Sequence, residues 1–439
     1  MAHRNQVVDG NCSVLEPDIE GIKMENRNNT QAPSYTAFTE SIVDDLLKHT
    51  IRNLLQSVTQ GALTKTEQCQ KLQQSFTQAM EAVLTDREVS HPVLDNLFTQ
   101  MYEQAVLSMS KAGLSQALLT RQYISGTGLI MSPLNCRTTI KDIYRIKGFA
   151  RGIDKAIRNL LEEQSNVHIL YPACGPFAPL LLPLLNYYKQ RACYTSEQIQ
   201  VTLIDIQPGA ILSLRQLIAD LGIGDFIQNV VEADATQFWP SGEIDLLIIE
   251  AMQHGFSKEG QFSMSKHLSQ FLSQSGLMLP QSISVRGILV DGETEFNRQW
   301  KEADFAHSQY LDPCAQSQRV ELGELLKISQ STLPTLQEIR LADGVHVIEG
   351  NTVQIPTGIA DIASRILAIY AHIEVFEGET VDQYDSGITH PRPDMTFYVD
   401  VKPKSPLPQN VVVHSGDYIR FYYQLTGLPG FVPVKVDRV

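Results

Sequence analysis

The chain has 439 residues, 43% of them hydrophobic and 19% charged, so it is long enough for roughly two or three globular domains and too apolar for a disordered protein. Its net charge of −14, without any block of Lys and Arg, excludes nucleic acid as a partner because phosphate binding needs clustered basic side chains. Six cysteines without a C-x-x-C pair indicate neither a metal site nor a disulfide framework, and favour a reducing compartment. The beginning of the chain lacks the apolar core of a signal peptide, and no apolar run is as long as a membrane span. We therefore expect a cytoplasmic protein with no membrane partner.

The N-terminal part of the chain is predicted to be helical after a polar leader. Residues 1–34 are rich in Asn and Gln, show no hydrophobic periodicity and are expected to be mobile. Apolar residues then recur at three- and four-residue intervals, with Ser90 as an N-cap and Pro92 in the first turn of the last helix. Amphipathic helices are predicted over residues 42–58, 72–83 and 94–106. We expect a helical module over residues 35–120 that forms an independent layer or an oligomer interface.

Strand and helix signals alternate over residues 121–290, after a Gly/Ser/Pro-bearing connector, QYISGTGLIMSP. Strands are predicted over residues 167–170, 201–204, 226–231, 244–249 and 282–289. Helices are predicted over residues 138–164, 180–185, 210–221 and 264–274. The alternation indicates a mostly parallel sheet covered by helices on both faces. Such sheets bind ligands outside the carboxyl ends of their strands.

The C-terminal part of the chain, residues 291–439, has a different pattern. It begins with a polar, partly helical stretch that extends to about residue 342 and contains the segment LGELLKIS. Short strands separated by turn residues are predicted over residues 345–348, 369–376, 395–401, 411–413, 418–425 and 432–436. This pattern is typical of an antiparallel β sandwich or barrel.

Three of the predicted strand ends carry residues suited to a ligand. Gly175, in the turn YPACGPFAP, lets the backbone approach a ligand at the start of a helix, where carboxylates and phosphates bind. Asp205 can accept both hydroxyls of a ribose, and Asp234 with Ala235 can contact an adenine edge. Taken singly, Gly175 also fits a packing glycine and Asp205 a helix cap. Together, and without a G-x-G-x-x-G motif, they predict a nucleoside cofactor that has no pyrophosphate.

The fourth strand end carries a pair of acids. Glu250 follows the strand over residues 244–249, and Glu259 lies in the loop after it. Acids at these positions can converge on one cation, and a planar guanidinium with several N–H donors suits them. The same spacing also fits a helix cap at Glu250 and a solvated acid at Glu259.

In this order, these features resemble the class I S-adenosylmethionine-dependent methyltransferases, and specifically the protein arginine N-methyltransferase family. Four segments carry the resemblance, which runs from about Thr138 to the C-terminus. They are KDIYRIKGFARGI, DLLIIEAMQHGFSKE, SGLMLPQSISV and the stretch from THPRPDM to RFYYQL. The resemblance implies an α/β fold: a Rossmann-like S-adenosylmethionine-binding methyltransferase domain over residues 121–290, then a connector or arm and a β-barrel substrate domain over residues 291–439. The helical module precedes both, and the family's behaviour implies a homodimer.

The resemblance also assigns roles to individual residues. Cofactor-binding residues would be Arg145, Ala173, Gly175, Asp205, Asp234 and Ala235, with Arg145 on the carboxylate of the cofactor's methionine part. Glu250 and Glu259 would bind the guanidinium, and His390 would relay a proton. A structural hydrogen bond at a barrel turn explains His390 equally well.

The chain departs from the family's pattern at several positions. Ala173 and Phe177 occupy the outer glycine positions of the cofactor turn, Pro391 replaces a tryptophan, and the loop AMQHGFSK between the glutamates differs from the usual one. The altered loop and the helical module favour free L-arginine or a small guanidino compound over arginine in a protein. Methylation of another nucleophile stays open, and so does an inactive cofactor-binding scaffold, which the altered turn favours.

Overall fold

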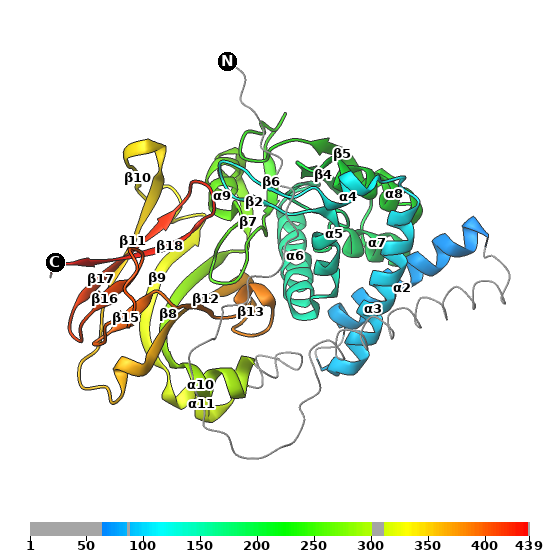
Figure 1. Cartoon of the computed structure of the whole chain (residues 1–439). Helices are drawn as coiled ribbons and strands as arrows, with labels where there is room; N and C mark the ends of the chain where they lie inside the picture. The colour runs from blue at the N-terminus through cyan, green and yellow to red at the C-terminus, as the bar shows by residue number, and fades with distance from the viewer. Residues whose placement is uncertain (1–63, 86–87, 301–310, 438–439) are drawn as a thin grey trace, which may run out of the picture. The chain divides into compact units, whose positions relative to one another are not determined.

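A computed structural model of the chain describes residues 64–85, 88–300 and 311–437 (Figure 1). The predicted leader and the predicted helix over residues 42–58 lie outside these residues. The elements described below belong to one unit, Lys65–Val439.

Two N-terminal helices form where the apolar periodicity predicts them, α2 (Lys65–Thr85) and α3 (His91–Ser110). Ser90 is the N-cap of α3, with extended backbone, although its side chain makes no capping hydrogen bond. Their apolar stripes are buried in the same core as the sheet domain, because α2 packs against α7 (Leu182–Arg191) and α3 against α8 (Pro208–Leu221). Helices α2 and α3 therefore share one core with the sheet domain, and the predicted helical module and its role in dimerisation stay predictions.

The connector after α3 contains a small hairpin, which leads into a long helix. Its elements are α4 (Gln116–Thr120), β1 (Tyr123–Ile124), β2 (Leu129–Ile130), α5 (Pro133–Cys136), η1 (Arg137–Lys141) and α6 (Ile143–Glu163). Strands β1 and β2 pair antiparallel around the Gly126–Thr127–Gly128 turn, so a segment predicted as a plain connector has a defined structure.

A five-stranded parallel sheet forms the centre of the domain, in the order β5-β4-β3-β6-β7. The strands are β3 (Val167–Pro172), β4 (Ile199–Asp205), β5 (Ile227–Glu232), β6 (Ile244–Ile248) and β7 (Leu272–Leu279). Besides α7 and α8, the connections contain η2 (Gly224–Phe226), α9 (Gln261–Leu268) and η3 (Ser269–Phe271). The strand order reverses between β3 and β6, and ligands bind at such switch points in Rossmann-like sheets.

Two sequence predictions for this sheet are wrong. The helix expected over residues 264–274 ends at Leu268, and Leu272 already begins β7. The strand expected over residues 282–289 forms as β8 (Ser282–Asp291) but pairs antiparallel outside the parallel sheet. Only Pro280 and Gln281 separate β7 from β8, and a parallel pairing needs a crossover of a dozen or more residues.

The C-terminal half forms the predicted antiparallel β-structure, coloured yellow to red in Figure 1. One sheet has the order β10-β11-β17-β18, another has the order β13-β12-β8-β9 with β14 on β12, and β15 pairs with β16. The strands after β8 are β9 (Val320–Ser329), β10 (Glu338–Arg340), β11 (His346–Gln354), β12 (Arg365–Phe376), β13 (Glu379–Val381), β14 (Arg392–Asp394), β15 (Phe397–Val399), β16 (Val411–Val413), β17 (Tyr418–Gln424) and β18 (Gly430–Val436). Helical turns join them: α10 (Gly292–Glu295), η4 (Phe296–Trp300), α11 (Pro313–Gln318), η7 (Ala342–Gly344), η8 (Ile362–Ser364) and η9 (Gly387–Thr389).

The predicted fold class is confirmed: N-terminal helices precede a Rossmann-like α/β domain, which is followed by the antiparallel barrel. One detail differs, since the segment LGELLKIS, expected inside a partly helical stretch, belongs to strand β9. The predicted domain limits stay predictions. None of the described helices is long and apolar enough to span a membrane.

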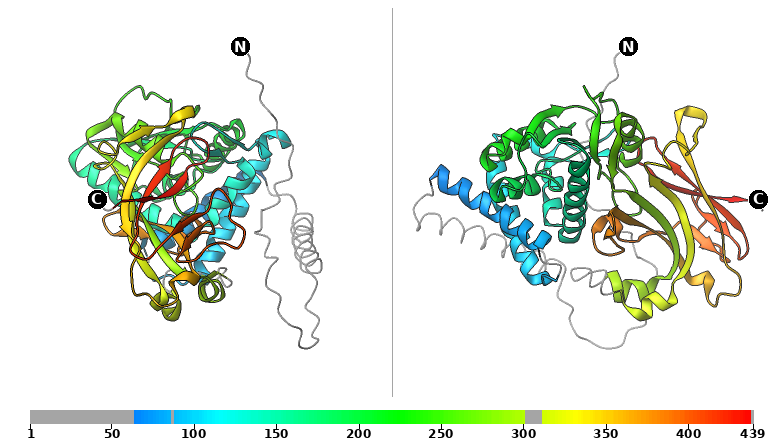
Figure 2. Two further views of the ribbon diagram at one scale, coloured as in Figure 1. Left: turned by 60° about the vertical axis from the view of Figure 1, so that its left-hand side comes forward. Right: turned by 180° about the vertical axis from the view of Figure 1, so that it is seen from behind.

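Helix α6 joins the α/β domain to the barrel. It packs against the parallel sheet and against β12 and β13, and Figure 2 shows it between the N-terminal helices and the barrel strands. Two glycines permit the close approach. A Cβ at Gly148 would lie 2.7 Å from the carbonyl oxygen of Thr380, and one at Gly152 would lie 2.5 Å from Cγ1 of Val375.

We expect Gly148→Ala to lower the free energy of unfolding by about 1–3 kcal/mol, since an overpacked contact forces the backbone apart. This cost should exceed the gain of about 1 kcal/mol that alanine brings to a helix interior. Urea unfolding of both proteins measures the difference. Gly224→Ala is the control, because no atom lies within 4 Å of the Cβ it would add. Equal stability of wild type and Gly148→Ala would contradict the close packing of α6 on the barrel.

Candidate active site

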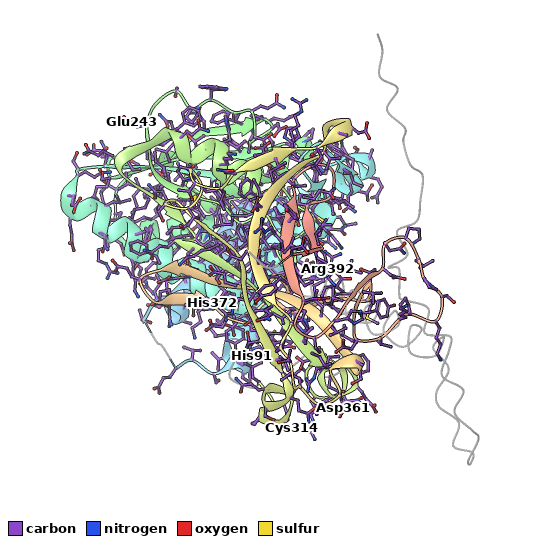
Figure 3. The ribbon with its side chains drawn as sticks, turned by 90° about the vertical axis from the view of Figure 1, so that its left-hand side faces the viewer. His91, Glu243, Cys314, Asp361, His372 and Arg392 are labelled. Atoms are coloured by element: carbon purple, nitrogen blue, oxygen red, sulfur yellow. The ribbon has the colours of Figure 1, made fainter. Side chains whose placement is uncertain are left out.

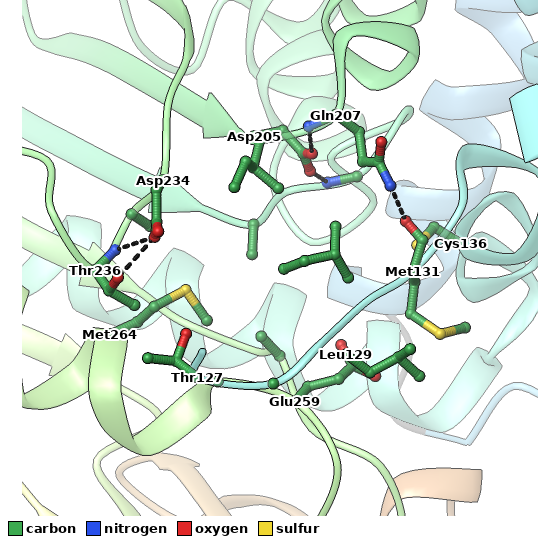
Figure 4. Close-up of a pocket in the computed structure, with 18 of the residues that line it drawn as sticks. Thr127, Leu129, Met131, Cys136, Asp205, Gln207, Asp234, Thr236, Glu259 and Met264 are labelled. Carbon is green, nitrogen blue, oxygen red and sulfur yellow. Dashed lines mark hydrogen bonds between the residues drawn. The ribbon is translucent and has the colours of Figure 1, made fainter. Parts of the chain in front are cut away.

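A cavity lies between the carboxyl ends of the parallel strands and the β1–β2 hairpin (Figure 4). Six of the nine predicted site residues line it: Ala173, Gly175, Asp205, Asp234, Ala235 and Glu259. The other three, Arg145, Glu250 and His390, are not among its lining residues. The structure thus brings most of the predicted cofactor residues to one place, as expected for strand ends that meet at one edge of a sheet.

The turn after β3 has the backbone that its glycine predicts. Gly175 has a φ of +66°, and the preceding Ala173 has a φ of +49°, so both adopt left-handed conformations. A Cβ at Gly175 would meet only Cβ of Cys136, at 3.6 Å, so the conformation rather than space requires glycine there. Phe177 is buried in the hydrophobic core and does not line the cavity. This departure from the family's pattern therefore leaves the cavity open.

Asp205 holds this turn against the end of β4. Its Oδ2 accepts a hydrogen bond from the backbone N–H of Gly175, and its Oδ1 accepts one from Gln207, both at 2.8 Å. Burial raises the pKa of Asp205 to about 6, although the backbone N–H donors act in the opposite direction. The backbone N–H of Ile206 is a third donor to this carboxylate, which has about four acceptor sites and can therefore still accept a ligand hydroxyl. Binding of a ribose by Asp205 stays a prediction.

Asp234 shapes the turn after β5. Its Oδ1 accepts hydrogen bonds from the backbone N–H of Thr236 at 2.9 Å and from the Thr236 hydroxyl at 2.7 Å. Its Oδ2 accepts only a long bond, 3.4 Å, from Gln237. Ala235, between them, is buried against the cavity. Contact of these residues with an adenine stays a prediction.

The two glutamates meet behind the hairpin. The side chain of Glu250 is only 7% exposed, and its Oε2 accepts a hydrogen bond from Nη1 of Arg145 at 2.8 Å. Its Oε1 is buried and has no hydrogen-bond partner among the described residues. Burial, followed by the negative charge of Glu250, raises the pKa of Glu259 to about 7. Arg145 balances only one of the two acids, and a second cation that entered would relieve their remaining repulsion.

Arg145 of α6 is held by two carboxylates. Its guanidinium pairs with Glu250 and also with Asp142, at 2.9 Å, and Nε lies 3.4 Å from the hydroxyl of Ser386. Burial acts to lower the pKa of Arg145, but the charges of Glu250 and Asp142 outweigh it and raise this pKa. The predicted role of Arg145, binding the cofactor's carboxylate, stays a prediction.

Sequence reasoning missed Asp142 and Ser386 as partners of Arg145. Asp142 could have been found, since it precedes Arg145 by three residues on a helix, a spacing that favours an ion pair. Ser386 gave no such signal, because it comes from the barrel, 241 residues away. Its hydroxyl donates to Asp142 at 2.6 Å.

His390 follows η9 in the barrel. Its ring packs edge-on against Tyr384, with 4.5 Å between ring centres, and burial lowers the pKa of His390. Its Nε2 is buried without a hydrogen-bond partner in the described part of the chain. Tyr384 donates a hydrogen bond to Glu295, which also pairs with Arg319. His390 therefore lies beside a buried ion pair of the barrel, and its role as a proton relay stays a prediction.

The loop between the glutamates is attached to the barrel. Phe256 is buried against Tyr423, with 5.0 Å between ring centres, and the backbone N–H of Lys258 donates to the carbonyl of Pro429 at 2.7 Å. Arg392, among the barrel strands in Figure 3, approaches the same loop. Burial, then the charges of Arg392 and Lys258, lowers the pKa of His254 to about 4, so this ring is neutral at pH 7. The positive charges of Lys258 and Arg392 therefore act on this loop, whose ends carry Glu250 and Glu259.

The β1–β2 hairpin is a functional element that sequence reasoning missed. Residues 127–131 line the cavity, and Leu129 donates a backbone hydrogen bond to the carbonyl of Lys258 at 2.7 Å. The backbone N–H of Gly427 donates to the carbonyl of Gly126 at 3.0 Å, which joins the hairpin to the barrel. A Cβ at Gly128 would lie 2.8 Å from the backbone of Glu259. The two glycines in SGTG, a turn signal between apolar pairs, could have indicated the hairpin.

We expect Glu259→Gln to stabilise the protein above pH 7 by about 1–3 kcal/mol and near pH 5 by less than about 1 kcal/mol. The folded-state pKa of about 7 lies above the ordinary value of 4.5, so the folded protein holds a proton between these values that the unfolded chain has lost. The stability of the wild type therefore falls as the pH rises through this range. A glutamine has no such proton to lose.

Urea unfolding at pH 5 and pH 8 measures this difference. Glu243→Gln, which changes an exposed glutamate before β6, is the control and should not change the pH dependence. A wild type and Glu259→Gln of equal stability at both pH values would contradict the raised pKa.

Comparisons with known proteins complete the description of the site. No family model matches the chain, and no curated protein matches it. Among solved structures, the chain is similar to the Trypanosoma brucei PRMT1 enzyme-prozyme heterotetrameric complex with AdoHcy, with 12% identity and a TM-score of 0.39 over 67% of this chain and 95% of that one. It is also similar to Arabidopsis thaliana protein arginine methyltransferase 10, with 11% identity and a TM-score of 0.35 over 62% of this chain and 84% of that one. Both structures come from the protein arginine methyltransferase family, which is the family that the sequence motifs resemble.

Proposed function

We propose that the chain is an S-adenosylmethionine-dependent N-methyltransferase that acts on the guanidino group of arginine. The observation that carries the proposal is the pair of buried glutamates, Glu250 and Glu259, beside a cavity built on three neighbouring strand ends. Glu250 already binds a guanidinium, that of Arg145, and keeps a second oxygen without a partner. This pair has the charge and the acceptors that a second guanidinium needs.

The residues around the cavity fit S-adenosylmethionine. The left-handed turn at Gly175 brings backbone close to the cavity, and Asp205 keeps lone pairs for ribose hydroxyls. Arg145 is the cation suited to the carboxylate of the methionine part, and it would exchange part of its contact with Glu250 for that carboxylate. The bound cofactor supplies a sulfonium-bound methyl group, which is an electrophile. The chain's own residues bind the cofactor and the guanidinium, orient them toward each other, and balance the positive charge of the guanidinium.

Catalysis by this chain is then mainly orientation of the guanidinium. Glu250 and Glu259 accept hydrogen bonds from its N–H groups, and the fixed carboxylates align one nitrogen with the methyl group. Glu250 follows the end of β6 by two residues and Glu259 precedes the start of α9 by two, so regular structure fixes both ends of the loop that carries them. Transfer of the methyl group to the guanidinium breaks the S–CH3 bond, forms the N–CH3 bond and gives a dication, which loses one N–H proton to leave the methylguanidinium cation. Glu259, with a pKa of about 7, is suited to accept that proton at neutral pH.

The substrate we favour is free L-arginine or a small guanidino compound, and arginine in a protein is the alternative. Lys258 lies in the loop between the glutamates and Arg392 approaches it, and their positive charges disfavour a basic peptide at this loop. The hairpin is hydrogen-bonded to the loop between the glutamates and to the barrel, and it covers the cavity. The buried position of Phe177 weakens the alternative of an inactive scaffold, because it leaves the cofactor turn unobstructed. A homodimer in the cytoplasm stays part of the proposal.

We expect Glu250→Gln and Glu259→Gln each to lower kcat/KM for methyl transfer to arginine by roughly 10²–10³-fold, because each removes a fixed charge that aligns the guanidinium. Labelled methyl transfer to L-arginine and to an arginine-containing peptide measures the loss. Calorimetry with S-adenosylhomocysteine should show that Glu259→Gln still binds the cofactor product.

Glu243→Gln is the matched control and should keep full activity, since Glu243 is exposed and far from the cavity lining. Full activity in both site variants would refute the guanidinium clamp. Absence of S-adenosylhomocysteine binding by the wild type would refute every methyltransferase function.

A further inference from the structure

A second hollow lies beyond the tip of the β1–β2 hairpin. It is lined by α9, by the barrel around β10 and β11, and by the tip itself. Thr127 lines both this hollow and the cavity, while Gly126 lines only the hollow and Gly128 only the cavity. The two spaces therefore adjoin at the hairpin tip, which lies between them.

Side chains of opposite charge line this hollow and form ion pairs with each other. Nζ of Lys266 lies 3.1 Å from Oε2 of Glu338, and Oε1 of Glu338 is hydrogen-bonded to Nδ1 of His346. These side chains are 33–37% exposed, so water and ligands reach them. Another wall residue, His267, already bonds the carbonyl of Phe238 through Nε2.

We propose that this hollow, here called the α-group cleft, binds the α-carboxylate and α-ammonium groups of free L-arginine while its guanidinium lies between Glu250 and Glu259. Lys266 and His346 bind the carboxylate, and Glu338 binds the ammonium. The inference rests on the proposed function, and it extends that function by naming the groups that distinguish a free amino acid from an arginine inside a polypeptide.

The spacing along α9 supports this assignment. Glu259 lies two residues before α9, and Lys266 lies in its second turn. From Gln261, the first residue of the helix, to Lys266 the rise is about 7–8 Å along the axis. Extended L-arginine spans roughly 7–8 Å from guanidinium to carboxylate at standard bond lengths, and the flexible stem of Lys266 covers the remainder.

The ion pairs on the cleft wall can exchange partners at a small cost in free energy. Half-exposed pairs contribute little to stability because water screens them, so a ligand that brings one charge of each sign replaces the pair without leaving either side chain unpaired. A ligand with only one charge leaves one partner unmatched. An arginine inside a peptide has neither a free α-carboxylate nor a free α-ammonium group, so the cleft adds nothing to its binding.

Methyl-transfer kinetics on three substrates test the proposal: L-arginine, agmatine, which lacks the carboxylate, and Nα-acetyl-L-arginine, which lacks the ammonium. Lys266→Ala should raise KM for L-arginine roughly tenfold or more and leave kcat and the KM for agmatine unchanged. Glu338→Gln should raise KM for L-arginine and agmatine and leave Nα-acetyl-L-arginine unchanged. The unaffected substrate shows in each case that the variant is folded.

Lys435→Ala is the matched control, since Lys435 forms a 2.8 Å ion pair with Asp417 and lines neither space. It should change none of the three KM values. The inference is wrong if Lys266→Ala affects L-arginine and agmatine alike, or if a peptide with an internal arginine is the better substrate, and in both cases the proposed function stands. No methylation of any guanidine refutes the proposed function and the inference with it.

Discussion

The structure of the site depends on two like-charged side chains, Glu250 and Glu259, that are buried at the end of one strand. Two carboxylates in such a place cannot both stay ionised without a cation, because burial and repulsion both favour the neutral form. Two features of the chain reduce this repulsion. Arg145 neutralises Glu250 with a direct ion pair, and Glu259 holds its proton up to a pH of about 7. This arrangement supports the proposal that the pair binds the guanidinium of a substrate.

Three separate parts of the chain hold this charge arrangement in place. The parallel sheet supplies the strand end, and α6 supplies Arg145. The barrel contacts Arg145 and Asp142 through Ser386, and it also contacts the loop between the glutamates. The glycines of α6 let the barrel approach closely enough for these contacts. The hairpin closes the cavity and bonds to the loop and the barrel. A change in the barrel can therefore alter the charge balance at the strand end without touching either glutamate.

Periodicity predicted most of the regular structure and failed where short segments follow each other closely. Helices α2 and α3 were found because long apolar stripes at helical spacing have few alternative structures. No strand was predicted where β7 lies, because its first residues, LSQSG, fit the end of a helix as well as the edge of a strand. Strand β8 was placed in the wrong sheet, since a strand signal does not reveal its partner. The LGELLKIS segment was ambiguous for the same reason.

The sequence by itself determined the α/β order, the antiparallel second half, and the strand ends at which Gly175, Asp205, Asp234 and Glu250 lie. These depend on local propensity and on the rule that parallel strands present their carboxyl ends together. Only the tertiary structure decided which of these residues contact each other. It showed that Arg145 pairs with Glu250, that Ser386 supports Asp142, that Phe177 faces the core, and that a hairpin covers the cavity. Such contacts join residues up to 244 positions apart. Their energies depend on burial and distance, which no local pattern in a single sequence encodes.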